Sequence, residues 1–278
     1  MQTNAAADAA ADDAAPWTKA EVDAVLEVRR RLLEKGVPPQ ALGERELIAI
    51  TLNSKCRVDE AVTKFETYRN DLLLAFGVDD VWANFDELHD HWHRLAVAGR
   101  DEGDRGIMWI NGGATPVAEE ERCIRACTLY FFAVHADRRS LREGITMVIN
   151  TARQGDRKKV GNEKKLQVAW QNYPTRPQHI FILGTSAITR VVINGLIAFA
   201  SLFAKNKVIA RIEFSSVDKV GALIGTSSLP EQHGGVARPS TAEFVRARLA
   251  SFPLMGLPPL EGGGPAGPVV AAEPMDVN

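Results

Sequence analysis

The chain has 278 residues, of which 45% are hydrophobic and 24% charged, and its formal net charge is −2. This composition is that of a globular protein with a sizeable core, and the length allows one large domain or two modest ones. A near-neutral charge argues against nucleic acid as a partner, because nucleic-acid-binding proteins normally carry a basic face. The three cysteines show no metal-ligand spacing and fit a reducing compartment, so we expect a cytoplasmic protein.

The two ends of the chain have compositions of their own. Residues 1–15 are rich in Ala and Asp and lack the basic start and apolar run of a secretory signal, which predicts a disordered acidic leader. Residues 253–278 are rich in Pro and Gly and predict a disordered tail. The folded part should therefore lie between residues 16 and 252.

Helical signals dominate residues 16–98. Thr18 and Glu21 form a capping box, and apolar residues follow it at helical spacing as far as "KGVPP". Further helices are expected around 47–52, over 58–76 and near "VWANFDELHDHWHRL". We therefore predict an N-terminal helical subdomain over residues 16–98.

Short apolar runs alternate with helical patterns over residues 99–252. Strands are predicted at 106–111, 144–150, 178–184 and 207–214, and helices at 118–143, 162–173, 185–207 and 240–252. Alternation of this kind implies crossover helices and a mostly parallel sheet. The predicted fold class is α/β (α+β overall), with a helical lobe followed by a sheet lobe.

The helix around residues 187–204 is unusually apolar, with Arg190 as its one charge. Predicted strands flank it closely on both sides, which leaves no room for a transmembrane topology. Its apolar arc is wider than a helix packed on one sheet face needs. Two interpretations stay open from composition alone: a buried crossover helix, or a helix that turns a second face toward lipid.

The order of elements around this helix is similar to that of a known family. Gln171, Asn172, Tyr173 and Pro174 form a "QNYP" turn, Ile180 to Leu183 form the strand after it, and "LPEQHGG" follows the next strand. This order resembles the CRAL-TRIO lipid-binding family, which includes the phosphatidylinositol-transfer, retinaldehyde-binding and tocopherol-transfer proteins. The resemblance runs from about residue 22 to residue 235 and is most specific over 170–235.

Three positions depart from the pattern of the family's phosphatidylinositol-binding members. Thr175 stands where they carry an acid, Arg211 stands where they carry a Lys, and the first subdomain reads "LNSK" where they carry Arg. The resemblance therefore implies lipid binding, and it leaves recognition of an inositol headgroup open.

The resemblance implies a sheet that forms the floor of a lipid cavity and a gate helix over residues 187–204. It also implies a monomeric, non-enzymatic protein without cofactor or metal, which associates peripherally with membranes and transfers a phospholipid or another hydrophobic lipid between them. The sequence leaves open which alternate residues of each strand face the cavity. The cavity candidates are Trp109, Met147, Ile149, Ile180, Ile182, Val192, Leu196, Phe199, Phe203 and Arg211. The membrane-contact candidates are Phe199, Leu202, Phe203, Lys205 and Lys207.

Other signals carry alternatives. Arg211 could contact a lipid phosphate, or it could pair with Glu213 or another acid as a structural ion pair. His89, His91 and His93 are two residues apart, so a helix scatters them over different faces and a shared metal ion is not expected. No nucleophile–base pattern indicates catalysis. A second candidate function is a protein-interaction module, for a small GTPase or a membrane-traffic component, with a degenerate lipid pocket.

Overall fold

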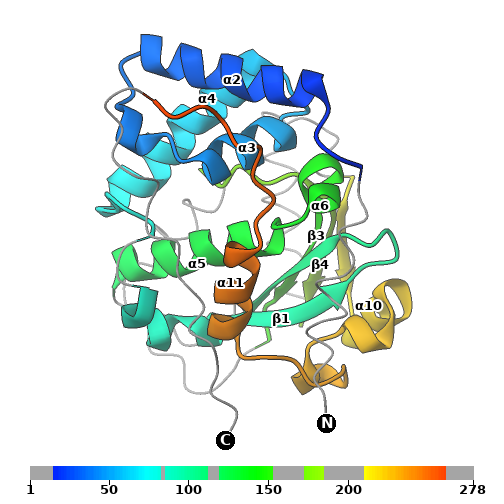
Figure 1. The fold of residues 1–278 in the computed structure, drawn as a ribbon. Helices are drawn as coiled ribbons and strands as arrows, with labels where there is room; N and C mark the ends of the chain where they lie inside the picture. Colours follow the sequence, from blue (N-terminus) through cyan, green and yellow to red (C-terminus); the bar gives the residue numbers. More distant parts are fainter. Residues whose placement is uncertain (1–14, 83–84, 112–118, 153–171, 185–209, 261–278) are drawn as a thin grey trace, which may run out of the picture.

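The computed structural model describes residues 15–82, 85–111, 119–152, 172–184 and 210–260 (Figure 1). Within these ranges a helical N-terminal region is followed by a five-stranded, mostly parallel sheet, which confirms the predicted fold class. Figure 1 shows α2, α3 and α4 stacked at one end of the molecule and the sheet at the other, with α5 between them. The predicted gate helix lies outside the described residues.

The N-terminal helices begin and end close to the predicted positions. They are α2 (Lys19–Glu34), α3 (Glu44–Asn53) and α4 (Val58–Thr67), with a π-helical turn at Tyr68–Leu73 and 3₁₀ turns at Pro39–Ala41, Leu74–Phe76 and Phe85–Arg94. The predicted capping box is confirmed, because Glu21 N donates to Thr18 Oγ1 at 3.2 Å and Thr18 N donates to Glu21 Oε2 at 2.8 Å.

The sheet has the strand order β1-β2-β3-β4-β5. The strands are β1 (Leu95–Arg100), β2 (Gly106–Asn111), β3 (Ile145–Asn150), β4 (Pro177–Leu183) and β5 (Ile212–Ser215). β1 pairs antiparallel with β2, and the other neighbours pair parallel. The predicted strands at 106–111, 144–150 and 178–184 are confirmed to within a residue, whereas β1 was not predicted. The expected subdomain boundary between residues 98 and 99 falls inside β1.

The connection from β2 to β3 differs from the single helix predicted over 118–143. The chain forms α5 (Glu120–Val134), breaks at His135–Asp137 and restarts as α6 (Arg138–Glu143). Asp137 causes the restart, because its carboxylate accepts from Ser140 N at 2.7 Å and so caps α6. After β5 come α10 (Val217–Ile224), 3₁₀ turns at Thr226–Ser228 and Glu231–His233, and α11 (Thr241–Ala250).

The two faces of the sheet belong to different hydrophobic clusters. One face shares a large core with α3, α5 and α11 and contributes Met108, Ile110, Met147 and Ile180 to it. The opposite face packs against α10 through Trp109, Val148, Phe181 and Leu183. A residue's position along its strand therefore decides which cluster it joins.

Residues 253–260 lie against the helices, so the tail predicted to be disordered from residue 253 is ordered over its first eight residues. The reason is a set of polar contacts between segments distant in sequence. These run from Trp17 Nε1 to Leu254 O (3.1 Å), from Met255 N and Gly256 N to Glu44 Oε1 (2.7 and 2.8 Å), and from Arg29 Nη1 to Pro258 O (2.6 Å).

Candidate functional site

Six apolar side chains form a continuous surface on one face of β3, β4 and β5. The parallel register pairs Met147 with Ile180 and Ile180 with Ile212, and it pairs Ile149 with Ile182 and Ile182 with Phe214. Directly paired residues of neighbouring strands point to the same side of a sheet. We call these six residues the apolar floor.

The floor brings together four of the five strand residues predicted to line a cavity, namely Met147, Ile149, Ile180 and Ile182. Trp109 does not join them, because it pairs in register with Val148 and therefore points to the opposite face. There the indole is fully buried, and its Nε1 donates to Asn111 Oδ1 at 3.3 Å. Met147, Ile149, Ile180 and Ile182 therefore share one face of the sheet and Trp109 lies on the other, and a role of either face in lining a cavity stays a prediction.

The remaining predicted cavity and membrane-contact residues fall on the gate helix and its flank. These are Val192, Leu196, Phe199, Leu202, Phe203, Lys205 and Lys207, all of which lie outside the described residues. Their roles stay predictions.

A cluster of arginines lies at one edge of the floor. Arg176 immediately precedes β4 and Arg211 immediately precedes β5, and since these strands are parallel both residues lie at the same edge. Burial lowers the pKa of the Arg176 guanidinium, and the charges of Arg211 and Arg57 lower it further, against the opposing effect of Glu143. The charges of Arg57, Arg176 and Arg211 therefore act on one another, although Arg57 is also paired with Glu60 at 2.5 Å, and we call these three residues the basic edge.

Backbone carbonyls hold two of these arginines in place. Arg176 Nη1 donates to Arg142 O, and Arg211 Nη1 donates to Pro177 O. The alternative structural pairing of Arg211 with Glu213 is not what the structure shows, because Glu213 pairs with Lys219. Arg211 thus lies at the edge of the floor, and its contact with a lipid phosphate stays a prediction.

Sequence reasoning missed Arg57 and Arg176. Arg176 had a usable signal in the sequence, because it lies just before the strand predicted at 178–184. That strand is β4, and it runs parallel to β5, which follows Arg211. Arg57 carried none, because it reaches the edge only through the packing of the α3–α4 turn.

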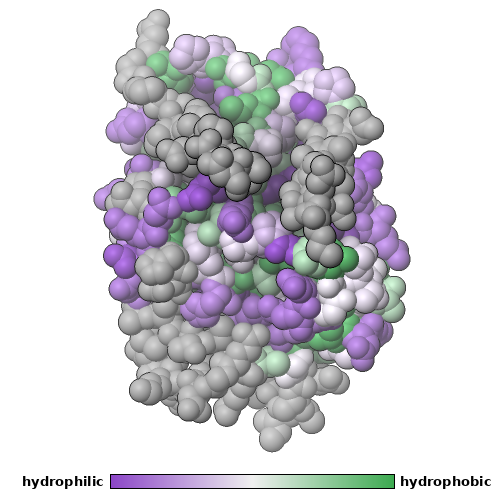
Figure 2. Space-filling view, turned by 60° about the horizontal axis from the view of Figure 1, so that its bottom comes forward, coloured by the Kyte–Doolittle hydropathy of each residue, from purple (hydrophilic) through white to green (hydrophobic). Residues whose placement is uncertain are grey.

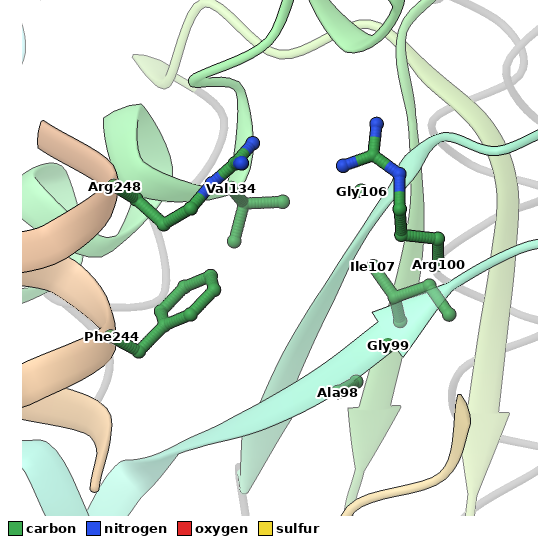
Figure 3. Close-up of a pocket in the computed structure, with 8 residues that line it drawn as sticks. All are labelled: Ala98, Gly99, Arg100, Gly106, Ile107, Val134, Phe244 and Arg248. Atoms are coloured by element: carbon green, nitrogen blue, oxygen red, sulfur yellow. The ribbon is translucent and has the colours of Figure 1, made fainter. Parts of the chain in front are cut away.

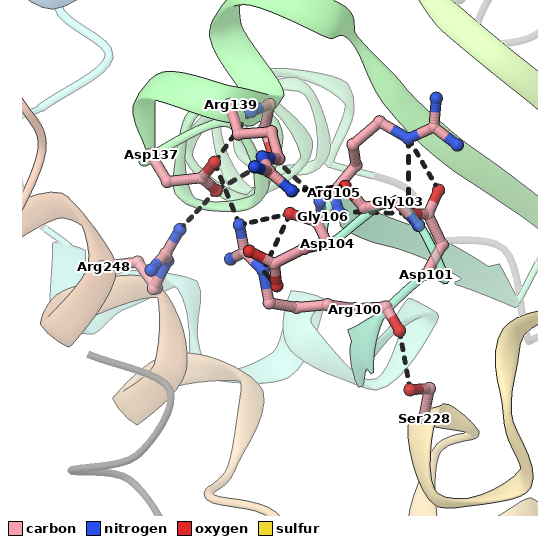
Figure 4. A network of polar contacts seen from close by, with 11 residues as sticks. Arg100, Asp101, Gly103, Asp104, Arg105, Gly106, Asp137, Arg139, Ser228 and Arg248 are labelled. Carbon is pink, nitrogen blue, oxygen red and sulfur yellow. Dashed lines mark hydrogen bonds and ion pairs between the residues drawn. The ribbon is translucent and has the colours of Figure 1, made fainter. Parts of the chain in front are cut away.

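A second polar cluster links the β1–β2 hairpin to α6 and α11 (Figure 4). The buried Asp137 carboxylate pairs with Arg100 Nη2 at 3.0 Å and with Arg248 Nη2 at 2.9 Å. Within the hairpin, Asp101 pairs with Arg105 at 3.0 Å. Arg100, Arg105 and Arg248 each have a carboxylate partner, so ion pairs join these elements of the fold.

A small pocket lies beside this cluster (Figure 3). Its volume is about 30 Å³, and it is lined by Ala98, Gly99, Arg100, Gly106, Ile107, Val134, Phe244 and Arg248. That volume matches roughly one water molecule. The pocket is therefore too small for an aliphatic chain and is distinct from the floor.

The described residues contain neither a metal-binding cluster nor a helix that could span a membrane. Within the described ranges, no three His, Cys, Asp or Glu side chains are arranged to hold a metal ion. His91 is buried and His93 is exposed, which agrees with predicted scattering over different faces. Each helix in the described part of the chain is too short or too polar to cross a bilayer.

The three cysteines are free thiols, and Cys123 and Cys127 are buried neighbours on α5. A hydrogen bond from Cys127 lowers the pKa of Cys123 to about 7, and Arg94 adds to the effect against the opposing burial. The pair is part of the core.

Comparisons with known proteins show a distant structural similarity and no match by sequence. No family model matches the chain. No curated protein matches it by sequence. The crystal structure of Sfh5 is similar to this structure, with a TM-score of 0.47 and 11% identity over 84% of this chain and 97% of that one.

Proposed function

We propose that the protein binds a lipid, with the aliphatic part on the apolar floor and residues 187–204 as the cover. The observation that carries the proposal is the floor itself: six apolar side chains in register on three neighbouring strands, immediately before and after the segment that resembles a gate helix. Burial contributes about 0.8 kcal/mol per CH₂, so a long acyl chain supplies ample affinity without further chemistry.

The basic edge favours a phospholipid as the ligand. Guanidinium groups bind phosphate oxygens through paired, charge-assisted hydrogen bonds. Arg176 and Arg211 lie where two floor strands begin, so a phosphate there would leave the acyl chains to run along the strands. Double replacement of Arg176 and Arg211 by Gln should weaken uptake of anionic phospholipids more than uptake of diacylglycerol.

Transfer between membranes requires the cover to open against a bilayer, because a lipid in water would lose its burial energy at once. Phe199, Leu202 and Phe203 are proposed to touch the membrane, and Lys205 and Lys207 to meet anionic headgroups. Replacement of Phe199 and Phe203 by Asp should abolish transfer between vesicles. Unchanged transfer would contradict this role.

The primary test is extraction of the purified protein with organic solvent, followed by mass spectrometry and by uptake of fluorescent phospholipid from vesicles. We expect bound lipid at near-stoichiometric amounts. A protein that contains no lipid and takes none up would contradict the proposal and favour an interaction module.

A matched pair of variants connects uptake to the floor. Ile182 and Leu183 are neighbours on β4, both are buried, and only Ile182 belongs to the floor. Ile182→Ala and Leu183→Ala should each cost about 2–5 kcal/mol of stability. Only Ile182→Ala should change lipid uptake by the protein that remains folded.

A further inference from the structure

The chain after α11 crosses the helical layer as an extended segment. Residues 254–260 run past α3 to α2 (Figure 1). Buried and exposed positions alternate along the first part of this segment, because Met255 and Leu257 are partly buried against the main core whereas Leu254 and Gly256 are exposed. Such alternation is typical of an extended peptide bound to a protein surface. We call residues 254–260 the strap.

Two side chains from α2 and the residues before it bind carbonyl groups of the strap. Trp17 Nε1 donates to Leu254 O at 3.1 Å. Arg29 Nη1 donates to Pro258 O at 2.6 Å. Because both acceptors are backbone atoms, these bonds fix the position of the strap without contacting its side chains.

The carboxylate of Glu44, the first residue of α3, binds the middle of the strap. Glu44 Oε1 accepts from the backbone N–H groups of Met255, Gly256 and Leu257, at 2.7, 2.8 and 3.4 Å. Gly256 has a φ of 67°, a left-handed conformation that glycine adopts without steric cost. Successive N–H groups around such a residue form a concave site for an anion. We call the side chains of Trp17, Arg29 and Glu44 the strap site.

The strap is attached less firmly than the chain that leads to it. Phe252 is 5% exposed and belongs to the main core, and Arg45 Nη2 donates to Leu249 O at 3.2 Å, so the end of α11 is fixed. The strap itself has only partly buried apolar side chains, and its bonds to Trp17 and Arg29 are exposed to solvent. Segments with few buried contacts open at a small fraction of the global free energy of unfolding. The strap can therefore leave its site while the rest of the molecule stays folded.

Other large apolar side chains that are exposed on the described residues are isolated. Besides Leu254 they are Leu74, Leu223 and Val236, which lie on different elements. Figure 2 shows hydrophobic and hydrophilic residues interspersed on one face of the molecule. The strap site differs from these positions because a segment of the chain is bound to it.

A strap that leaves its own site can bind the site of another copy, because the two surfaces offer the same atoms. Pro258 and Pro259 restrict the free strap to extended conformations, which reduces the entropy lost on binding. We propose that the strap site is an interaction surface whose partner is the strap of a second copy of this chain. This inference does not depend on lipid binding.

The tether sets the protein concentration at which this exchange is measurable. A strap joined to its own site by a short chain has an effective concentration of roughly 1 mM. If the strap is bound in about 99% of molecules, the same contact between two copies has a Kd of about 10 μM. The wild-type protein should stay mostly monomeric near that concentration, because its own strap competes for the site.

Two full-length variants with complementary defects test the exchange. Leu257→Asp places a charge against the core and so weakens the strap, while its strap site stays intact. Glu44→Lys removes the acceptor for three N–H groups and so weakens the site, while its strap stays intact. At about 100 μM, roughly ten times that Kd, each variant alone should sediment as a monomer and the mixture as a heterodimer. An excess of the synthetic peptide PLMGLPPL, residues 253–260, should dissociate the heterodimer.

Matched controls carry the same substitutions at positions outside the contact. Leu254→Asp lies on the strap at a side chain that is 48% exposed, so its own strap should stay bound and its mixture with Glu44→Lys should stay monomeric. Glu102→Lys lies on the exposed turn between β1 and β2, and its mixture with Leu257→Asp should stay monomeric too. If Leu257→Asp does not fold, Gly256→Ala replaces it, because an added Cβ there meets no neighbouring atom and only the left-handed backbone opposes it.

Each outcome decides the inference. A heterodimer that forms only in the complementary mixture supports exchange of the strap. A mixture that stays monomeric, although hydrogen exchange shows both straps released, overturns it. A dimer of either variant alone also overturns it, because neither variant has both an intact strap and an intact site. Unchanged protection of residues 255–257 in both variants would mean that these contacts do not hold the strap, which overturns the inference as well.

Discussion

Replacement of Asp137 by Asn and by Ala should separate two contributions of one buried carboxylate. The side chain is 5% exposed and accepts from Ser140 N at 2.7 Å, which caps α6. It also pairs with Arg100 of β1 and Arg248 of α11 (Figure 4). The carboxylate therefore holds together a strand and two helices that are distant in sequence.

The magnitude follows from these partners. Loss of a helix cap costs about 1 kcal/mol, and removal of one partner from a buried ion pair costs about 3–5 kcal/mol. Arg100 retains Asp104 as a second carboxylate, so the larger loss falls on Arg248. Asp137→Ala should lose both contributions, about 4–6 kcal/mol. Asp137→Asn retains an oxygen for the cap and should lose about 3 kcal/mol.

The assay is urea denaturation at a low temperature, where the weaker variant still folds. Asp104→Asn is the control, because Asp104 pairs with the same Arg100 but its side chain is 40% exposed, and it should cost less than about 1 kcal/mol. If Asp137→Asn costs no more than Asp104→Asn, the reasoning is refuted and the buried charge does not stabilise the fold.

Three further predictions test other polar groups. Burial lowers the pKa of His135 to about 4, so this residue should make the free energy of unfolding fall by about 3 kcal/mol as pH drops from 6.5 to 4. Urea titrations at a series of pH values should show that His135→Leu lacks this contribution to the pH dependence. Thr51→Val should be neutral or stabilising in thermal melts, whereas Thr128→Val should cost about 1 kcal/mol, because only Thr128 has a hydroxyl partner. Glu44→Ala should raise hydrogen exchange at residues 255–257, whose N–H groups bond to that carboxylate.

Each of these has its own contradicting result. An unchanged pH dependence in His135→Leu would mean that the imidazole is protonated in the folded protein. Equal melting temperatures for Thr51→Val and Thr128→Val would remove the distinction between paired and unpaired hydroxyls. Glu44→Gln retains an acceptor oxygen, so protection of residues 255–257 should survive in it, and faster exchange there would contradict the hydrogen-bond assignment.

The strands that could be predicted are those with a local signal. Residues 106–111, 145–150 and 178–183 are apolar runs bounded by Gly, Pro or polar residues, which indicate buried strands by themselves. β1 has the sequence "LAVAGR", in which Ala and Gly carry weak β propensity. Its strand conformation comes from antiparallel pairing with β2, which is tertiary information.

The site was predictable only where it follows strand alternation. Period-two spacing placed Met147 with Ile149 and Ile180 with Ile182 correctly, but it could not say that Trp109 belongs to the other face. Arg57 is brought near Arg176 by the packing of a strained turn. No pattern within the sequence indicates that placement, because the left-handed residues there are Lys and Cys instead of Gly.

The contacts of residues 253–260 affect when the helical layer can be completed during biosynthesis. Trp17 and Arg29 donate to the carbonyls of Leu254 and Pro258, so α2 meets these partners only after more than two hundred further residues have been translated. A nascent chain still attached to the ribosome at α11 has α2 without them. Closure of that layer therefore waits for residues 254–258, and a segment inserted between α11 and residue 260 would delay or prevent it.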